Sequence, residues 1–219
     1  VFGFEGVIHE LARKIGMDPI DLRLKNAATE GYKTIYGATF GPIGYVETLE
    51  AAKAHPHYTA PLGPDQGRGI ATGFWFNRGG ETTASLNITP DGTVTLLLGN
   101  PDVAGSRVSI CMMAAEELGI SVDKVRPIIG DTSTLGFNRV SAGSRVTFSA
   151  GMAIVLSARK AIETLCQRAA MMWDVPEDGV VFEDGHVRPA SSNVGDFEPL
   201  SIADIAKKAT ETGGPIAGH

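Results

Sequence analysis

Apolar residues recur every three or four positions in several stretches of the chain, and this spacing predicts amphipathic helices. The first predicted helix begins near residue 4. Its apolar stripe consists of Phe4, Val7, Ile8, Leu11 and Ile15. Two further helices are predicted over 106–119 and 150–172, and a short one follows Ser201, which forms a capping-box pattern with Asp204. The stripes of these helices are candidates for the core.

Strand-like patterns surround two Asp-Gly pairs, which favour tight hairpin turns. The stretch "TASLNITPDGTVTLLLG" predicts a hairpin at Asp91-Gly92, and "GVVFEDGHVRP" predicts a second one at Asp184-Gly185. Strand-like periods also occur in "RGIATGFWF", residues 68–76, and in "KVRPIIG", residues 124–130. Hairpins alternating with helices predict an α+β fold, with a mainly antiparallel sheet covered by helices on one face.

The chain has an irregular middle stretch, residues 28–66, that interrupts these patterns with one short helix. We therefore predict a helical segment and connector over 1–66 and an α+β domain over 67–219. The first residues are already helix-patterned, and the last stretch, "TGGPIAGH", is rich in glycine. Both features indicate a fragment of a longer chain.

Composition narrows the class of protein. The 219 residues carry a formal net charge of −6 and are 43% hydrophobic, as in an ordinary globular protein, and a net negative charge disfavours a general nucleic-acid surface. No apolar run reaches the roughly 18 residues that a membrane span needs. We expect neither nucleic-acid binding nor a membrane span.

Two cysteines, Cys111 and Cys166, fall at apolar positions of predicted helices. This placement suits small buried hydrophobic residues better than a disulfide framework. A reducing compartment follows as the simplest expectation. The cytoplasm is therefore predicted, or the periplasm if a missing N-terminal segment carries an export signal.

Two Gly-Ser-Arg triplets, Gly105-Ser106-Arg107 and Gly143-Ser144-Arg145, each stand just ahead of a predicted helix. Free N–H groups at a helix start, together with a nearby arginine, favour a phosphate. If the fold joins the two helix starts, they form a basic groove for a pyrophosphate. The alternative is that serine merely caps each helix and each arginine pairs with a surface carboxylate. Neither loop has the spacing of a Walker or Rossmann loop.

The sequence offers little for nucleophilic or metal chemistry. It contains no Cys-x-x-Cys, His-Glu-x-x-His or Gly-x-Ser-x-Gly motif, and the pair His55 and His57 lies in the connector. We predict no metal ligated by the protein itself and no catalytic residue within the chain.

Six stretches, in this order and spacing, resemble the molybdenum-binding large subunit of the xanthine dehydrogenase and aldehyde oxidase family. They are "ELARKIGMDPIDLRLKN", "GRGIATGF", "DGTVTLLLGNPDVAGSR", "AAEELGI", "GDTS" and "AGSRVTFSAGMAIVLSARK". The resemblance implies a molybdopterin-binding domain, with Gly105, Ser106 and Arg107 in one cofactor-facing loop and residues 143–146, Gly143 to Val146, in another.

The same resemblance implies a molybdenum hydroxylase that adds water-derived oxygen to aldehydes or N-heterocycles, with a small-molecule substrate. The implied cofactor is molybdopterin, as the cytosine dinucleotide in bacteria. Iron–sulfur clusters and FAD are implied on partner domains or subunits, and the intact enzyme is expected to be an oligomer.

Two departures from the family pattern limit this expectation. Val103-Ala104-Gly105 stands where many members have Gly-Gln-Gly, so the glutamine contact with the cofactor is missing. The family's catalytic glutamate belongs to a Gly-x-Gly-Glu stretch that this chain does not contain. We therefore expect the fragment alone to be inactive. The alternative is a noncatalytic α+β interaction or assembly module that has lost cofactor binding.

Overall fold

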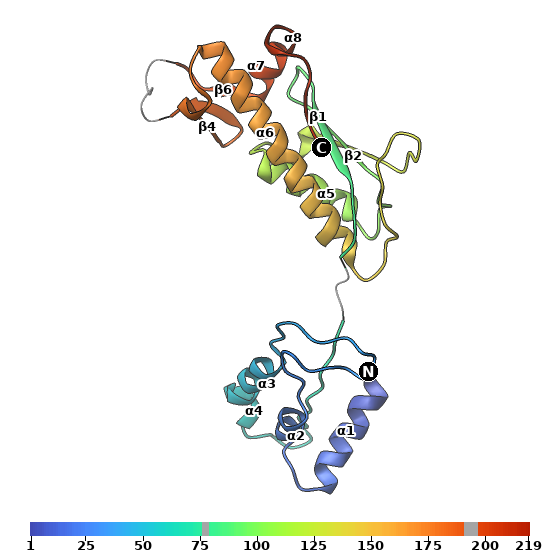
Figure 1. Cartoon of the computed structure of the whole chain (residues 1–219). Coiled ribbons are helices and arrows are strands. Elements are labelled where there is room, and N and C mark those ends of the chain that lie inside the picture. The colour runs from blue at the N-terminus through green and yellow to red at the C-terminus, as the bar shows by residue number, and fades with distance from the viewer. Residues whose placement is uncertain (76–78, 191–196) are drawn as a thin grey trace. The chain divides into compact units, whose positions relative to one another are not determined.

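The computed structural model describes residues 1–75, 79–190 and 197–219. The chain divides into two compact units, Val1–Phe74 and Trp75–His219 (Figure 1). This division falls later than residue 66, and Thr72 is bonded within the first unit: its N–H donates to the carboxylate of Glu5 at 2.7 Å. The described residues include no helix with both the length and the apolar composition needed to cross a membrane.

Helices dominate the first unit. They are α1 (Phe2–Lys14), α2 (Pro19–Lys25), α3 (Tyr45–Ala54) and α4 (Pro56–Thr59). Helix α2 begins where the sequence places a cap and a proline: the carboxylate of Asp18 accepts hydrogen bonds from the N–H groups of Ile20 and Asp21.

A buried ion pair joins α1 to α2. Arg23 Nη2 lies 2.6 Å from Glu5 Oε2, and both side chains are almost fully buried. Burial alone would raise the pKa of Glu5, but the hydrogen bonds from Arg23 and Thr72 outweigh it and the pKa lies below its usual value. Glu5 is therefore the inward-facing anchor of α1.

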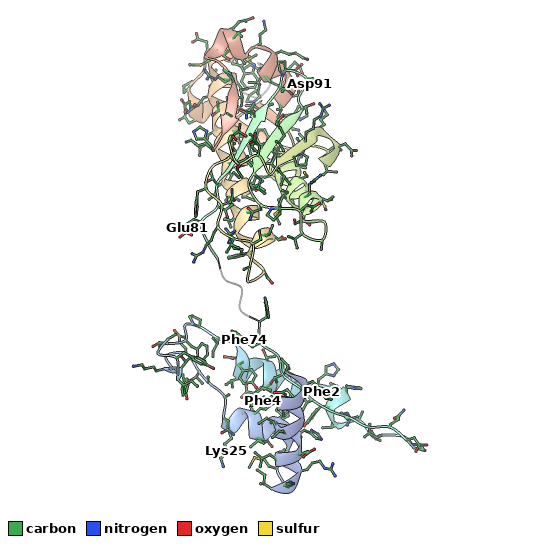
Figure 2. All side chains as sticks on the ribbon, turned by 90° about the vertical axis from the view of Figure 1, so that its right-hand side faces the viewer. Phe2, Phe4, Lys25, Phe74, Glu81 and Asp91 are labelled. Atoms are coloured by element: carbon green, nitrogen blue, oxygen red, sulfur yellow. The ribbon has the colours of Figure 1, made fainter. Side chains whose placement is uncertain are left out.

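The apolar stripe predicted on α1 is not its buried face. Phe4, Val7, Leu11 and Ile15 are exposed, whereas Glu5 and Ala12 are buried. The helix was predicted correctly, but its rotation was wrong, because pairing with Arg23 turns Glu5 inward and the stripe outward. Figure 2 shows Phe4 near the start of this helix.

The strand predicted over 68–76 is also wrong for residues 68–75, which form no strand; Phe76 lies outside the described residues. The segment has side-chain partners instead of a neighbouring strand. Thr72 N–H is bound by Glu5, and the carbonyl of Ile70 accepts from Arg23 at 3.4 Å. Alternating apolar residues therefore do not form a strand here, because no neighbouring strand in the described part of the chain pairs with them.

The second unit is built on a four-stranded sheet in the order β3-β2-β1-β7. The strands are β1 (Ala84–Ile88), β2 (Val94–Leu98), β3 (Val125–Ile129) and β7 (Ile216–Gly218). Strand β3 runs parallel to β2, and the other pairs are antiparallel, so the sheet is mainly antiparallel as predicted.

The first predicted hairpin is confirmed between β1 and β2. Asp91 Oδ1 accepts from Thr89 Oγ1 at 2.6 Å and from Thr93 N at 2.9 Å, and these bonds lower the pKa of Asp91 to about 2. Figure 2 shows Asp91 at this hairpin end of the unit and Glu81 near its other end.

Two helices cover one face of the sheet, namely α5 (Ser106–Glu117) and α6 (Gly151–Trp173), which agree with the predicted ranges (Figure 1). A π-helical turn, Val146–Ala150, precedes α6. The core between sheet and helices contains fully buried Leu86, Leu96, Ile110, Ile154 and Leu165.

A smaller sheet lies beside the far end of α6 (Figure 1). It consists of β4 (Val180–Glu183), β5 (His186–Pro189) and β6 (Leu200–Ser201), and the predicted hairpin at Asp184-Gly185 is confirmed. Short 3-10 turns cover Val122–Lys124 and Glu177–Gly179. Helices α7 (Ile202–Lys207) and α8 (Ala209–Thr212) follow, and the predicted capping box is present at the start of α7.

Candidate functional site

The two Gly-Ser-Arg loops meet at one cavity of the second unit. We call residues 99–107 the first loop, residues 140–145 the second loop, and the cavity between them the loop pocket. It has a volume of about 330 Å³. Its lining consists of Val103, Ser106, Ser141, Ala142, Ser144, Arg145, Val146 and Thr147. The predicted juxtaposition of the two helix starts is confirmed.

Both loops enter their helices through two consecutive left-handed residues. In the first loop, φ is 49° at Ala104 and 84° at Gly105; in the second, φ is 62° at Gly143 and 56° at Ser144. Such values are strained for residues with a Cβ, so each loop is held in this shape by its surroundings. The two loops thus share a left-handed backbone turn as well as a triplet.

The start of α5 is already capped by a carboxylate of its own loop. Asp102 Oδ1 accepts from the N–H of Arg107 at 3.0 Å, and Arg107 Nε lies 3.7 Å from Asp102 Oδ2. The N–H of Ser106 donates to the carbonyl of Val103 at 3.1 Å. The carboxylate of Asp102 therefore interacts with the positive end of the helix dipole. The predicted anion position beside Arg107 is taken by the chain itself.

Arg145 has a structural role that the sequence did not predict. Its side chain is only 2% exposed. Its guanidinium donates at 2.8 Å to the carbonyls of Arg139 and Gly80, and it also bonds to the carbonyl of Glu81 and the hydroxyl of Thr82. The guanidinium thus holds the segment leading into β1 against the second loop, and contact of this charge with a phosphate stays a prediction.

Several polar groups at the loops remain without partners among the described residues. The buried Ser141 Oγ, which lines the loop pocket, accepts and donates no hydrogen bond, and neither do the amide atoms of the buried Asn100. Ser144 Oγ, by contrast, accepts from Trp75 Nε1 at 2.8 Å. Buried polar atoms are usually paired, so an orphan in a pocket lining points to a ligand.

The predicted site residues divide into two groups. Ser106, Ser144, Arg145 and Val146 line the loop pocket, whereas Gly105, Arg107 and Gly143 do not. Sequence reasoning missed the remaining lining residues, which are Val103, Ser141, Ala142 and Thr147. Val103 stands in the stretch that takes the place of the family's Gly-Gln-Gly, and the signal for the other three was their closeness to the second triplet. Contact of any of them with a cofactor stays a prediction.

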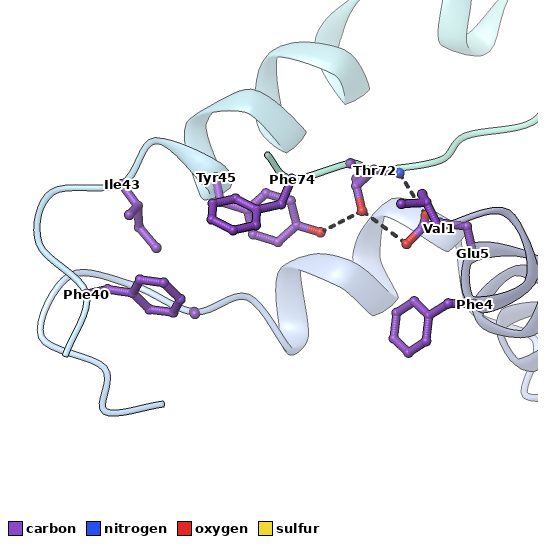
Figure 3. A pocket seen from close by; sticks show the side chains of 10 residues that line it. Val1, Phe4, Glu5, Phe40, Ile43, Tyr45, Thr72 and Phe74 are labelled. Carbon is purple, nitrogen blue, oxygen red and sulfur yellow. Dashed lines mark hydrogen bonds between the residues drawn. The ribbon is translucent and has the colours of Figure 1, made fainter. Parts of the chain in front are cut away.

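A larger cavity lies in the first unit, with a volume of about 540 Å³ (Figure 3). Its walls are mainly apolar and include Phe40, Tyr45 and Phe74. Tyr45 donates to Thr72 Oγ1, which donates to Glu5 Oε1, both at 3.2 Å. Because the one carboxylate in its lining is held by these bonds and by Arg23, this cavity does not suit an anionic ligand or offer a free base.

The described residues contain no cluster of three or more His, Cys, Asp or Glu side chains that could hold a metal ion. Cys111 and Cys166 are free thiols, and burial raises the pKa of both. Neither cysteine is therefore an activated thiolate.

Comparison with known proteins identifies the family. The sequence profile of the molybdopterin cofactor-binding domain matches residues 45–219. A putative xanthine dehydrogenase molybdenum-binding subunit of Escherichia coli (strain K12) is 28% identical over 100% of this chain and 31% of its own length. The nicotine 6-hydroxylase large subunit of Paenarthrobacter nicotinovorans is 25% identical over 92% of this chain and 27% of its own.

The fold agrees with this match. Reconstituted CO dehydrogenase from Oligotropha carboxidovorans superposes with a TM-score of 0.71 at 21% identity, over 100% of this chain and 32% of that one. The chain spans 27–31% of the length of these two curated relatives. The profile match over most of its length shows that the chain belongs to the molybdopterin cofactor-binding domain family.

Proposed function

We propose that this chain forms part of the cofactor site in the large subunit of a molybdenum hydroxylase, and that the loop pocket holds a polar end of the molybdopterin. The observation that carries the proposal is the unpartnered, buried Ser141 Oγ in a pocket built from two helix-start loops. The family match favours this interpretation over a noncatalytic module.

The residues of the pocket fit such a group. None of the described lining residues is acidic, and three of them are serines. No side chain caps the turn that starts at Val146, so the N–H groups there are available to an acceptor oxygen. Serine hydroxyls and backbone N–H groups suit the oxygens of a pterin or a phosphate. The role of these residues is to bind and orient, since the pocket contains no candidate base.

When bound, the molybdenum–pterin group supplies the redox chemistry that adds water-derived oxygen to a substrate carbon. The chain's residues contribute the positioning: Arg145 fixes the second loop, and Asp102 fixes the first. We also propose, by resemblance alone, the cytosine dinucleotide form of the cofactor, iron–sulfur and flavin partners, an oligomeric enzyme and a cytoplasmic or periplasmic location.

Metal analysis of the parent enzyme tests the proposal. Ser141→Leu fills the loop pocket and is expected to lower the molybdenum and pterin content per polypeptide several-fold, whereas Ser141→Ala lowers it less. Ser133→Leu is the matched control, because it adds the same side chain to an exposed loop outside the pocket. Unchanged molybdenum in folded Ser141→Leu protein contradicts the proposal.

A further inference from the structure

Strand β7 covers only part of β1. The two strands pair through Leu86↔Gly218, Asn87↔Ala217 and Ile88↔Ile216. In this register His219 lies opposite Ser85, and one further residue would lie opposite Ala84. No described strand adjoins Ala84 on the side of β1 that β7 occupies.

The backbone of β1 has its hydrogen-bonding groups in place for a longer partner. Thr89 donates to Thr93 across the hairpin at 2.9 Å, so odd-numbered residues of β1 face β2. By the alternation of antiparallel strands, the N–H and C=O groups of Ala84 then point to the side of β7. An open edge of this kind is a template for an added strand.

A groove continues from this open edge. It has a volume of about 540 Å³ and lies between residues 82–84 on one wall and the start of α6 on the other, with His219 at its end. The helix wall presents Phe148, Met152 and Leu156, each more than half exposed. Such a row of exposed apolar side chains is typical of an interaction surface.

Strand β7 already runs in contact with α6 at the mouth of this groove. Ser157 Oγ donates to the carbonyl of Gly218 at 2.7 Å, and a Cβ at Gly218 would collide with the carbonyl of Ser157. A strand that continues past Gly218 in the same direction therefore enters between β1 and α6, along the apolar row.

We infer that the groove binds an extended segment of the same polypeptide, continuous with β7 and antiparallel to residues 82–84, which lead into β1. Its second and fourth residues after Gly218 would face α6 and carry apolar side chains. The curated relatives, of which this chain spans 27–31%, are long enough to supply such a segment in cis. This inference does not rest on cofactor binding.

Thiol labelling and hydrogen exchange test it, with the 219-residue chain compared with the parent polypeptide. Met152→Cys, in a Cys166→Ser background, is expected to react with a maleimide at least about tenfold more slowly in the parent. The control Met171→Cys lies on the same helix outside the groove, is exposed, and is expected to react equally in both. The buried Cys111 stays unreactive in folded protein and so reports unfolding.

Amide exchange decides whether the cover is a strand. The N–H of Ala84 is expected to be protected in the parent and to exchange in the 219-residue chain. Equal labelling of Met152→Cys in both proteins overturns the inference, and so does protection of Met152→Cys without protection of Ala84. Protection that appears in the 219-residue chain only as its concentration rises assigns the groove to a second copy and also overturns it.

Discussion

The first and second loops carry the same triplet, and each contains two consecutive left-handed residues, yet the surroundings of their two arginines differ. Arg107 is 53% exposed on its side chain and pairs with Asp102 of its own loop. Arg145 is buried and bonds to acceptors more than sixty residues away in the sequence. The acceptors that surround an arginine, and not the motif that contains it, decide whether its charge is free for a ligand.

Arg145→Ala provides the largest test of this contrast. Removing the guanidinium leaves the carbonyls of Arg139, Gly80 and Glu81 without their donor, and the expected loss in unfolding free energy is about 3 kcal/mol or more. Urea denaturation of the chain measures it. Arg145→Lys should recover only part of this lost free energy, since an ammonium group cannot reproduce the planar, multiply donating guanidinium. A loss below that of Arg107→Ala would reverse the comparison.

The left-handed residues of the two loops predict an intermediate loss of unfolding free energy, similar in both loops, when their glycines are replaced. Gly105→Ala and Gly143→Ala should each lower the unfolding free energy by about 1 kcal/mol, because alanine resists a positive φ. An added Cβ at Gly105 meets no atom within 4 Å, so the cost there is conformational.

Gly79→Ala is the control for these substitutions. Its φ is ordinary and its added Cβ would make only van der Waals contact, at 3.8 Å from the ring of Phe148. It should leave stability unchanged or slightly raised. If Gly105→Ala costs no more than this control, the left-handed turn is not held by the fold.

The smallest effect is expected for Arg107→Ala. An exposed arginine 3.7 Å from a carboxylate contributes little, so the loss in unfolding free energy should be about 0.5 kcal/mol or less. The same urea series measures it, and high salt should leave the difference from wild type smaller still. A loss above 1 kcal/mol would indicate that Asp102 depends on Arg107 to cap α5.

Local signals in the sequence were sufficient for the elements that depend on local chemistry. The two Asp-Gly turns and the Ser201–Asp204 capping box form where turn and cap residues predict them, and α5 and α6 form where the apolar periodicity predicts them. The exposed stripe of α1 and the absent strand at 68–75 depend on Glu5, whose partners Arg23 and Thr72 lie 18 and 67 residues away. No local pattern contains such a pairing.

For the site too, the sequence predicted the local features and not those that depend on long-range contacts. Resemblance located the two loops, and the fold joins them. The burial of Arg145 could not be read from the triplets, because it depends on how residues 80–82 approach the second loop. The unpartnered hydroxyl of Ser141 likewise has no local signal in the sequence.

The long-range pairing of β1 has a consequence for biosynthesis. Polypeptides leave the ribosome from the N-terminus, and an element can settle only after its partners have emerged. The Glu5–Thr72 bond of the first unit joins residues 67 positions apart in the sequence. Strand β1, in contrast, has one edge open until residues 216–218 have emerged. During translation, this open edge can therefore pair with another chain, a hazard that chaperones limit.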